Sequence, residues 1–212
     1  MQTKFITIEG IEGVGKTTAV KTIEDYLIQH KQEFIVTREP GGTLVAEQIR
    51  KIVLMPQDEK ITADAELFLM FACRAQHIEN VIKPALKAGK WVVSDRFVDA
   101  SYAYQGGGRK MDMKKIEMLD QWTVGDCQAQ LTILLDAPPE IGLARAKHRG
   151  PQDRIEQEKI EFFVRVRDVY LKRAKQFPDR FFVIDATKPL ETVERELINQ
   201  CDEILTSAHH AN

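Results

Sequence analysis

A glycine-rich segment near the start of the chain carries the residue types best suited to chemistry on phosphate groups. The segment Gly10–Thr17, with the sequence GIEGVGKT, fits the pattern G-x-x-x-x-G-K-[ST]. It lies between an apolar run and a stretch with helical spacing, which is the context that this pattern requires. Glycines let the backbone curl around phosphate oxygens, and N–H groups at the helix start bind the anion. We therefore expect Lys16 to reach a transferring phosphate and Thr17 to offer its hydroxyl to Mg²⁺.

Glu12 is an unusual residue inside this loop, because a carboxylate is repelled by a polyphosphate bound close to it. Its side chain either points into solvent or binds something other than phosphate. In the second case, its partner would be a hydroxyl group of the second substrate. The residue types alone leave both alternatives open.

Charged residues also mark the ends of two other strand-like runs. Asp95 and Arg96 come directly after the run Trp91–Ser94, and Arg38 ends the preceding run. Open α/β sheets bind their ligands at the carboxyl ends of their strands. At that edge Asp95 can organise Mg²⁺ and its waters, and the two guanidinium groups can clamp an acceptor phosphate bidentately. An ordinary surface ion pair is the alternative for each residue taken singly.

The charge-rich segment Lys147–Ile155 is predicted to form a mobile lid. Its cations could close over the transferring group and neutralise its developing charge, although a solvated charge run is the alternative. No general base is evident, and an acceptor that is itself a phosphate does not need one. A monophosphate is largely dianionic near neutral pH, because its second pKa is about 6. Catalysis would then rest on positioning and electrostatics.

Five short apolar runs alternate with longer stretches of helical spacing and predict an α/β fold. Their hydrophobicity is continuous rather than alternating, which is typical of strands covered on both faces. We expect a doubly wound five-stranded parallel sheet flanked by helices, with the charged residues described above at its carboxyl edge. The predicted strands are Phe5–Ile8, Phe34–Thr37, Trp91–Ser94, Leu131–Leu135 and Phe181–Ile184.

Two segments between these strands stand out. A long helical stretch, Ile61–Leu86, places Arg74 close to an otherwise apolar stripe, where an arginine is out of place. The residues Lys87–Lys90 supply its stop signal. The segment Val98–Lys110 contains three consecutive glycines and is predicted to be a working loop.

The composition of the chain bounds its class. With 212 residues, 43% of them hydrophobic, the chain can bury one sizeable core, so we expect a single domain over residues 1–212. A formal net charge of −2 gives no field that would attract nucleic acid. Three scattered cysteines are typical of a reducing compartment, and neither a signal peptide nor a membrane-spanning run is evident. A cytoplasmic location without membrane attachment is therefore predicted.

These residues resemble those of bacterial thymidylate kinases, a family of P-loop nucleoside-monophosphate kinases, over nearly the whole chain. The resemblance implies transfer of the γ-phosphate of ATP to dTMP, which gives dTDP and ADP on the route to dTTP. It also implies ATP and Mg²⁺ as cofactors and a homodimer as the assembly. The segments that carry the resemblance are Ile8–Thr18, Arg38–Gly42, Ser94–Phe97, Ala103–Gly108 and Asp153–Glu156.

The resemblance further implies a role for each of several residues. The phosphate loop has no basic residue between Gly10 and Lys16, so the catalytic cation is expected from the lid segment, with Arg145 as a further candidate. The residues implied in catalysis are Lys16, Arg96, Arg149 and Arg154, and those implied to hold the metal are Thr17 and Asp95. The residues implied to bind ATP are Gly10, Ile11, Glu12, Gly13, Val14, Gly15, Lys16, Thr17, Thr18, Arg145, Ala186 and Thr187.

The same family implies a set of contacts to the phosphate and sugar of dTMP. Arg38 and Arg96 would hold the phosphate, with Arg50 as a further contact on that side. Tyr104 would lie against the sugar and disfavour a ribose 2′-OH. Glu12 would bind the 3′-OH, which gives the unusual carboxylate of the phosphate loop a purpose.

The implied contacts to the thymine base include one departure from the family. Arg74 would hydrogen-bond the base, and Ser101 and Gln105 would contact its edge. The family commonly stacks a phenylalanine on thymine four residues before the helix arginine, where this chain has Met70, with Phe71 adjacent. A shifted phenylalanine and a methionine-lined base pocket are both physically possible, and plain core packing is the alternative for Phe71.

Two other functions are compatible with parts of this pattern. Another nucleoside-monophosphate or deoxynucleoside kinase would share the phosphate loop, the lid arginines and the fold, and would differ in the residues around the base. A P-loop regulatory switch would bind nucleotide without efficient transfer to a small molecule. The arginines and the glutamine on the acceptor side argue against such a switch.

Overall fold

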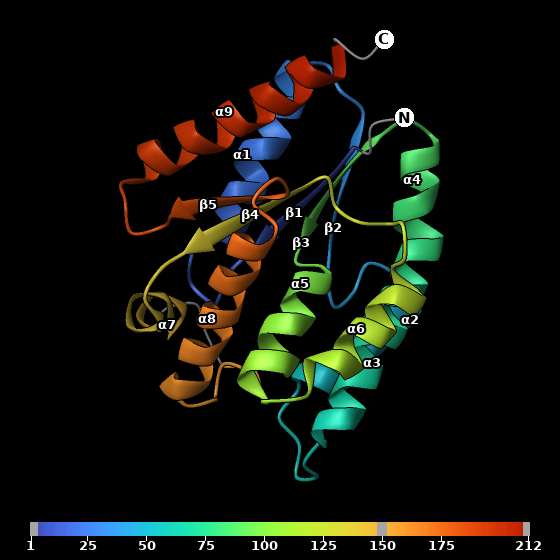
Figure 1. Cartoon of the computed structure of the whole chain (residues 1–212), viewed down its shortest axis with the longest axis vertical. Helices are drawn as coiled ribbons and strands as arrows, with labels where there is room; N and C mark the ends of the chain where they lie inside the picture. Colours follow the sequence, from blue (N-terminus) through green and yellow to red (C-terminus); the bar gives the residue numbers. More distant parts are fainter. Residues whose placement is uncertain (1–3, 148–151, 210–212) are drawn as a thin grey trace.

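The computed structural model describes residues 4–147 and 152–209 and contains the predicted five-stranded parallel sheet (Figure 1). The strands follow the order β2-β3-β1-β4-β5, so the chain builds one half of the sheet before it crosses to the other side of β1. Such a reversal leaves a crevice at the carboxyl edge of the sheet. The strands are β1 (Phe5–Glu9), β2 (Phe34–Arg38), β3 (Trp91–Asp95), β4 (Leu131–Asp136) and β5 (Phe181–Asp185).

Each strand extends one residue beyond its predicted end, and that additional residue is charged. The parallel ladders continue to these positions, since Arg38 pairs with Asp95 and Asp136 with Asp185. Backbone groups make the pairing, so it does not depend on the charge of the side chain. All five charged side chains therefore leave the sheet at the same edge.

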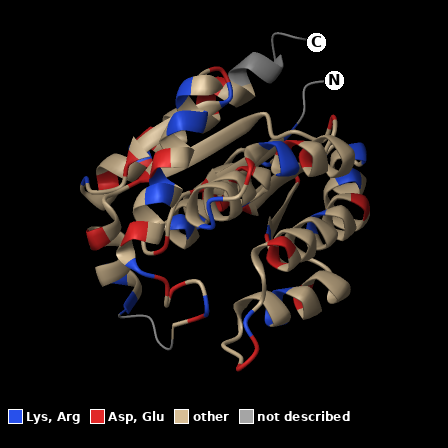
Figure 2. Ribbon diagram, turned by 60° about the horizontal axis from the view of Figure 1, so that its bottom comes forward, with Lys and Arg blue, Asp and Glu red and all other residues tan. Residues whose placement is uncertain are grey.

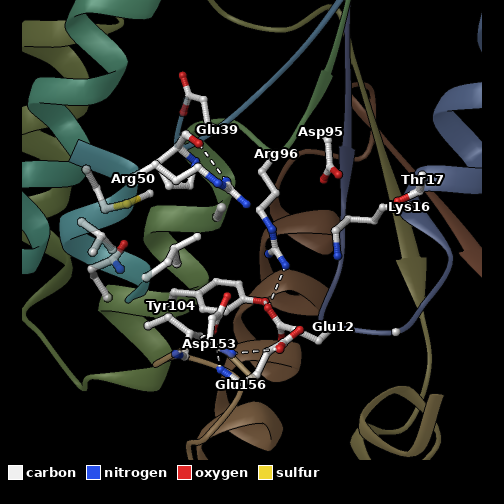
Figure 3. A pocket seen from close by; sticks show the side chains of 18 of the residues that line it. Glu12, Lys16, Thr17, Glu39, Arg50, Asp95, Arg96, Tyr104, Asp153 and Glu156 are labelled. Atoms are coloured by element: carbon white, nitrogen blue, oxygen red, sulfur yellow. Dashed lines mark hydrogen bonds and ion pairs between the residues drawn. The ribbon is translucent and has the colours of Figure 1, made fainter. Parts of the chain in front are cut away.

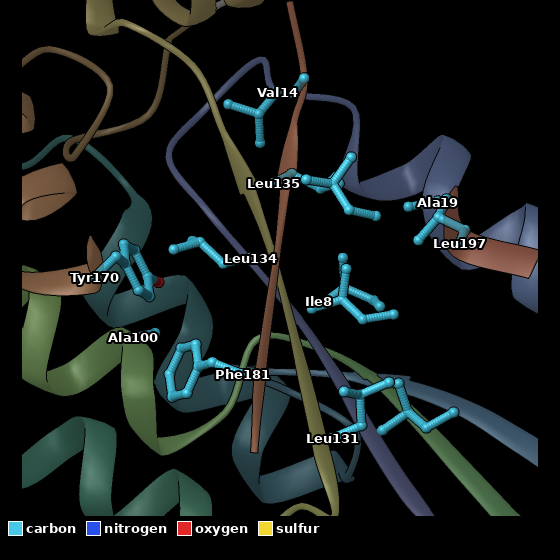
Figure 4. Packing of buried hydrophobic residues seen from close by; sticks show 14 of the residues in the cluster. Ile8, Val14, Ala19, Ala100, Leu131, Leu134, Leu135, Tyr170, Phe181 and Leu197 are labelled. Atoms are coloured by element: carbon cyan, nitrogen blue, oxygen red, sulfur yellow. The ribbon is translucent and has the colours of Figure 1, made fainter. Parts of the chain in front are cut away.

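Helices cover both faces of the sheet, as the continuous hydrophobicity of the strands predicted. Helices α1 (Lys16–Gln29) and α9 (Leu190–His209) lie together on one face, and α8 (Ile160–Gln176) covers β4 and β5 on the other (Figure 1). Figure 4 shows Leu134 and Tyr170 on one side of the sheet and Ile8 and Leu197 on the other. The remaining helices are α2 (Leu44–Leu54), α3 (Ala63–His77), η1 (Ile78–Ile82), α4 (Lys83–Lys87), α5 (Val98–Ser101), η2 (Tyr102–Gly108), α6 (Met113–Thr123) and α7 (Pro139–Lys147).

The long helical stretch predicted over residues 61–86 is present as three consecutive elements, α3, η1 and α4. It begins after Thr62, whose side chain accepts a hydrogen bond from the N–H of Ala65, and it ends at the predicted stop signal. Arg74 lies on its buried side and is 0% exposed. The three cysteines of the chain are buried and free.

The prediction of a loop at Val98–Lys110 was wrong, because α5 and the π-helix η2 occupy most of this segment. Its glycines do not make a turn but permit close packing against α8. A Cβ atom on Gly107 would lie 2.7 Å from the carbonyl oxygen of Arg165, and one on Gly108 would lie 2.4 Å from the ring of Phe162. Residues Val98–Gly108 are buried, whereas Lys110 at the end of the segment is exposed, so the segment presents its side chains from helical elements.

Charges of both signs are interspersed along the helices rather than gathered by sign (Figure 2). This distribution accords with the formal net charge of −2. Within residues 4–147 and 152–209, no helix has the length and apolar character needed to cross a lipid bilayer.

Candidate active site

A cavity opens at the carboxyl edge of β1 and β3, where the order of the sheet predicts a ligand crevice (Figure 3). In Figure 3, Lys16, Thr17 and Asp95 approach it from one side and Arg50 from the opposite side, with Arg96 between them. The described residues that line it are Glu12, Gly13, Gly15, Lys16, Thr17, Glu39, Pro40, Arg50, Val53, Leu54, Met70, Asp95, Arg96, Ala100, Tyr104, Gln105, Asp153, Ile155 and Glu156.

The phosphate loop has the backbone of an anion site. Gly15 has a φ of 98°, a left-handed conformation that glycine adopts without strain, and it leads directly into α1. No side chain caps this helix start, so its first N–H groups are available to an anion. Gly13 also lies close to α7, because a Cβ atom there would be 1.8 Å from the carbonyl oxygen of Gly142. Gly15 is therefore favoured by its conformation, and Gly13 by both its position close to α7 and its φ of 76°.

Lys16 is held at the mouth of this loop. Its Nζ donates hydrogen bonds to the carbonyl oxygens of Gly10 at 3.2 Å and Ile11 at 2.8 Å. Burial and the neighbouring guanidinium of Arg96 lower the pKa of Lys16 to about 8, although the carboxylate of Asp95 raises it. A bound polyphosphate would favour the charged form and replace the carbonyl partners.

Arg96 has a backbone conformation that is rare outside glycine, with a φ of 71°. Three hydrogen bonds hold it: its N–H donates to Ile8, its carbonyl oxygen accepts from Ser94 Oγ, and the next N–H, of Phe97, donates to Glu9 Oε1 at 2.7 Å. The strained turn directs the guanidinium into the cavity, where Nη2 donates to a carboxylate oxygen of the phosphate loop at 2.8 Å (Figure 3).

That oxygen belongs to Glu12, whose side chain is only 11% exposed and does not point into solvent. Glu12 Oε1 accepts from Arg96 and, at 2.7 Å, from the hydroxyl of Tyr104. The guanidinium carbon of Arg96 lies 4.7 Å from the centre of the Tyr104 ring. Three predicted site residues from three separate elements therefore form one cluster.

Four buried polar atoms of the cavity have no hydrogen-bond partner within the described part of the chain: Glu12 Oε2, Asp95 Oδ1, Arg96 Nη1 and Gln105 Oε1. Buried polar groups in proteins are nearly always paired, and the exceptions indicate a site completed by a ligand or water. Glu12 Oε2 can accept a hydrogen bond from a hydroxyl, and Asp95 Oδ1 can accept one from a metal-bound water. Arg96 Nη1 can donate one to a phosphate oxygen.

Asp95 and Thr17 fit the requirements of Mg²⁺, which takes hard oxygen ligands and keeps several waters. Both line the cavity beside the phosphate loop. No group of three or more His, Cys, Asp or Glu side chains that could hold a metal occurs among the described residues. A cation there would need oxygen atoms from a bound phosphate, which is the usual arrangement for Mg²⁺ with nucleotides.

Of the ten residues predicted to bind dTMP, six line the cavity and four are placed differently. Met70 lines it, whereas Phe71 packs in the core with its ring 4.7 Å from the guanidinium carbon of Arg74. The six lining residues are Glu12, Arg50, Met70, Arg96, Tyr104 and Gln105, and the four others are Arg38, Phe71, Arg74 and Ser101.

Arg74 and Ser101 belong to a buried network behind the cavity. Arg74 donates from Nε to Glu39 Oε2 at 2.8 Å, from Nη1 to Ser101 Oγ at 3.0 Å, and from Nη2 to the carbonyl oxygen of Phe97 at 3.0 Å. The other carboxylate oxygen of Glu39 is 2.9 Å from His77 Nδ1. The network fixes the wall of the cavity, because Glu39 itself lines it.

Arg38 is half exposed and is not among the residues that line the cavity. Its Nη2 donates to both carboxylate oxygens of Glu47, at 2.9 and 3.0 Å, and one of these oxygens also accepts from the N–H of Gly42. Arg50 lies deeper and donates to the carbonyl oxygen of Pro40 at 2.8 Å. The predicted phosphate contact through Arg38 would require its guanidinium to leave Glu47.

Of the two lid arginines predicted to act in catalysis, the structure describes Arg154. Arg154 lies against α2 and α3, where its Nη2 donates to Glu66 Oε2 at 2.6 Å and its Nε to the carbonyl oxygen of Val53 at 2.7 Å. Arg149 falls outside the described residues. The catalytic roles of both arginines stay predictions.

A second hollow lies on the other side of the phosphate loop, where the adenine pocket is predicted. Arg145 joins its two sides by donating from Nη1 to the carbonyl oxygen of Ala186 at 2.9 Å. Thr187 lies beside it, and its hydroxyl donates to Asp185. The described residues that line this hollow are Val14, Gly15, Thr18, Ala19, Thr22, Arg145, Ala186, Lys188, Leu190, Val193, Glu194 and Leu197.

Glu9, the last residue of β1, is a buried acid that the sequence analysis did not single out. It accepts hydrogen bonds from the N–H of Phe97 at 2.7 Å and from the hydroxyl of Tyr170 at 2.6 Å. Burial and the nearby carboxylate of Asp99 raise the pKa of Glu9 to about 8, against the opposing effect of these bonds. Its signal in the sequence was a carboxylate within an apolar strand that leads into the phosphate loop.

Replacing Glu9 with glutamine is expected to remove a pH dependence of stability. The pKa of Glu9 is higher in the folded than in the unfolded chain, so its stabilising contribution is complete below about pH 4.5 and is lost as pH rises through about 8. Across that window, the free energy of unfolding of the wild type should fall relative to Glu9→Gln by at most about 1.4 kcal/mol per pH unit. Urea unfolding of both proteins between pH 5 and pH 9 measures this; a constant difference would contradict it.

Comparisons with known proteins agree with this geometry. A family model described as Thymidylate kinase matches residues 8–197. The thymidylate kinase of Ruthia magnifica subsp. Calyptogena magnifica is 48% identical over 194 residues, which are 92% of this chain and 95% of that protein. That of Pseudomonas putida strain F1 is 49% identical over 193 residues, which are 91% of this chain and 92% of that protein. The crystal structure of thymidylate kinase from Ehrlichia chaffeensis matches with a TM-score of 0.76 and 32% identity, over 93% of this chain and 97% of that one.

Proposed function

The chain belongs to the thymidylate kinase family, and we propose on this premise that dTMP and the γ-phosphate of ATP meet in the cavity at the edge of β1 and β3. The protein transfers a phosphate from ATP to dTMP, which gives dTDP and ADP. The observation that carries the assignment of the site is the set of four unpartnered buried polar atoms. They belong to residues that line one cavity together with the phosphate loop and Met70.

The transfer needs positive charge on both sides of the migrating phosphoryl group. Lys16 and the N–H groups at the start of α1 supply it from the ATP side. Arg96 supplies it from the acceptor side, where the strained backbone and Glu12 hold its guanidinium before substrate arrives. Thr17 and Asp95 would hold Mg²⁺, which would supply positive charge to neutralise the charge that develops on the phosphate. No general base is required, because the acceptor phosphate is already largely dianionic.

The phosphate of dTMP is proposed to lie between Arg50 and Arg96. Its base is proposed to lie against Met70 and Gln105. Glu12 Oε2, which has no partner within residues 4–147 and 152–209, is the acceptor proposed for the 3′-OH of the sugar. Tyr104 lines the cavity, with the centre of its ring 4.7 Å from the guanidinium carbon of Arg96, and is proposed to lie against the sugar. A ribose 2′-OH would meet this ring.

ATP is proposed to extend from the phosphate loop toward the hollow at Arg145 and Ala186, where its adenine would bind. Arg149 and Arg154 are proposed to approach the phosphates when the lid segment closes. Arg154 must then exchange its partner Glu66 for a phosphate oxygen. The whole chain is proposed to act as a single kinase domain in the cytoplasm.

A homodimer is proposed to form through α3 and α6. Three large apolar side chains on these helices are mostly exposed: Phe68 (61%), Met118 (70%) and Trp122 (85%). Exposed apolar groups that cluster on neighbouring helices are typical of a protein interface. Light scattering should give twice the 24.2 kDa of one chain, Trp122→Glu should give a monomer, and the control Ile28→Glu on α1 should stay dimeric. A monomeric wild type would reject the proposal.

The reaction is tested by measuring ADP release with ATP and Mg²⁺ and with dTMP, dUMP, CMP, GMP or thymidine as acceptor. Strong turnover with dTMP, weaker turnover with dUMP and none with thymidine are expected. Turnover with thymidine alone would identify a nucleoside kinase. Nucleotide binding without ATP consumption that depends on dTMP would instead indicate a regulatory switch.

A further inference from the structure

Glu66 of α3 joins three side chains from two segments far from it in the sequence, and it is not among the residues that line the cavity. Its carboxylate is 0% exposed and accepts hydrogen bonds from Gln105 Nε2 at 2.9 Å, Arg109 Nε at 3.2 Å and Arg154 Nη2 at 2.6 Å. Burial alone would raise the pKa of Glu66, but these partners outweigh it and hold the pKa below its ordinary value. Glu66 is therefore an ionised carboxylate at neutral pH.

An ionised carboxylate has no proton to donate, and this decides how the amide of Gln105 is turned. The NH₂ group of Gln105 must face Glu66, because an amide oxygen there would oppose a negative charge. The amide oxygen Oε1 is then directed away from Glu66, is buried, and has no partner within the described part of the chain. Gln105 lines the cavity and its Nε2 is engaged by Glu66, so Oε1 is the amide atom left to pair with a bound base.

Arg109 holds the carboxylate of Glu66 in this position. It donates from Nε to both oxygens of Glu66, at 3.2 Å each, and from Nη1 to Glu158. Its guanidinium carbon also lies 4.9 Å from the centre of the Phe162 ring. Glu66 is thus held by Arg109 on both of its oxygens, independently of the hydrogen bond that it accepts from Arg154.

Pyrimidine bases differ in what they offer to such an acceptor. Thymine and uracil carry a hydrogen on N3, between two carbonyl groups, and this N–H can donate to Gln105 Oε1. Cytosine carries a lone pair on N3 beside an amino group, and two acceptors would then face each other. A ligand that leaves the buried Oε1 without a hydrogen bond, and places a second acceptor against it, is strongly disfavoured.

We propose that Glu66 is a specificity-determining positioning residue: it orients the amide of Gln105 so that the site accepts pyrimidines with an N3–H donor and rejects those with an N3 acceptor. The proposal rests on the proposed function, because it requires the base of the acceptor nucleotide to lie against Gln105. It assigns the selectivity to a residue that does not touch the substrate.

The test is the ratio of kcat/KM for dTMP to that for dCMP in the wild type and in Glu66→Gln. A glutamine at position 66 can donate as well as accept, so the amide of Gln105 is free to turn. The ratio is expected to fall about tenfold or more, which is 1.4 kcal/mol or more of discrimination. The ratio of dTMP to dUMP should stay within about twofold, because both bases present the same N3–H. An altered lid affects dTMP and dCMP alike, so it cancels from the first ratio.

Glu158→Gln is the matched control. The variant replaces a carboxylate that contacts Arg109, by the same isosteric change, but position 158 does not contact Gln105. The ratio of kcat/KM for dTMP to that for dCMP should therefore equal the ratio of the wild type. Gln105→Met completes a double-mutant cycle. It should lower the ratio by itself, and Glu66→Gln added to it should lower the ratio no further. Glu66→Asp, which keeps the charge and withdraws the oxygens, serves if Glu66→Gln does not fold, and it should also lower the ratio.

Failure of the proposed function and failure of the role of Glu66 would give different results. A wild type that does not phosphorylate dTMP would overturn the proposed function. A wild type that prefers dTMP to dCMP, combined with an unchanged ratio in the folded Glu66 variant, would overturn the role of Glu66 alone. An equal fall of the ratio in Glu158→Gln, or a further fall when Glu66→Gln is added to Gln105→Met, would show a general loss of packing and would also reject it.

Discussion

Replacing Lys16 with alanine is expected to lower kcat by about 10³-fold or more while the protein stays folded. The ammonium group lies at the mouth of the phosphate loop, where its hydrogen bonds to the carbonyl oxygens of Gly10 and Ile11 hold it ready for a phosphate. Positive charge placed where negative charge develops stabilises the transition state more than the ground state. The loss should therefore appear in kcat and kcat/KM together.

The measurement is ADP release with saturating ATP and dTMP, accompanied by the melting temperature of the variant. Lys21→Ala is the matched control, because Lys21 lies on the same helix and makes exposed ion pairs with Glu24 and Asp25. Its kcat should equal that of the wild type. A kcat for Lys16→Ala within tenfold of the wild type would contradict the role of Lys16.

Replacing Arg74 with alanine is expected to lower the free energy of unfolding by about 3–5 kcal/mol. Arg74 is 0% exposed, and its three hydrogen bonds satisfy Glu39, Ser101 and the carbonyl oxygen of Phe97. Without it, the buried carboxylate of Glu39 loses its charged partner and stays out of reach of water. The KM for dTMP should also rise, because Glu39 forms part of the cavity wall.

Urea unfolding at neutral pH measures the first effect, and kinetics below the melting temperature of the variant measure the second. Arg38→Ala is the matched control for stability, since it removes an arginine from an ion pair that is half exposed. Exposed pairs contribute about 1 kcal/mol or less. Equal losses for the two variants would show that burial of the Arg74 network has no special effect on stability.

The phosphate loop and the sheet could be predicted because their signals are local. Glycine spacing around Gly13 and Gly15 reflects the backbone conformation that those residues must adopt themselves. Runs of apolar residues such as Trp91–Ser94 predict buried strands without reference to their partners. The charged residues at the strand ends followed from the same reasoning, because parallel strands end at one edge. The family resemblance then supplied the substrate, and the comparisons confirmed the family.

The segment Val98–Lys110 shows where local signals become ambiguous. Consecutive glycines favour a turn when they face solvent, but they permit close helix packing when another element approaches. Here α8 approaches so closely that Gly107 and Gly108 have no room for a Cβ atom. The approach of a helix from a segment more than fifty positions later is not recorded in the glycines themselves.

Tertiary structure alone decided which polar groups are paired. Arg74 was noticed as out of place, but its partner Glu39 lies 35 positions away, and Glu66 lies 39 positions from Gln105 and 88 from Arg154. Helical spacing tells which side chains are buried, because burial depends on the element's own period. It does not tell which buried charges meet, because that depends on how separate elements are placed against one another. The sequence by itself therefore determined the chemistry available to this protein, and the packing of α3 against the sheet and η2 decided which of its side chains contact substrate and which orient those that do.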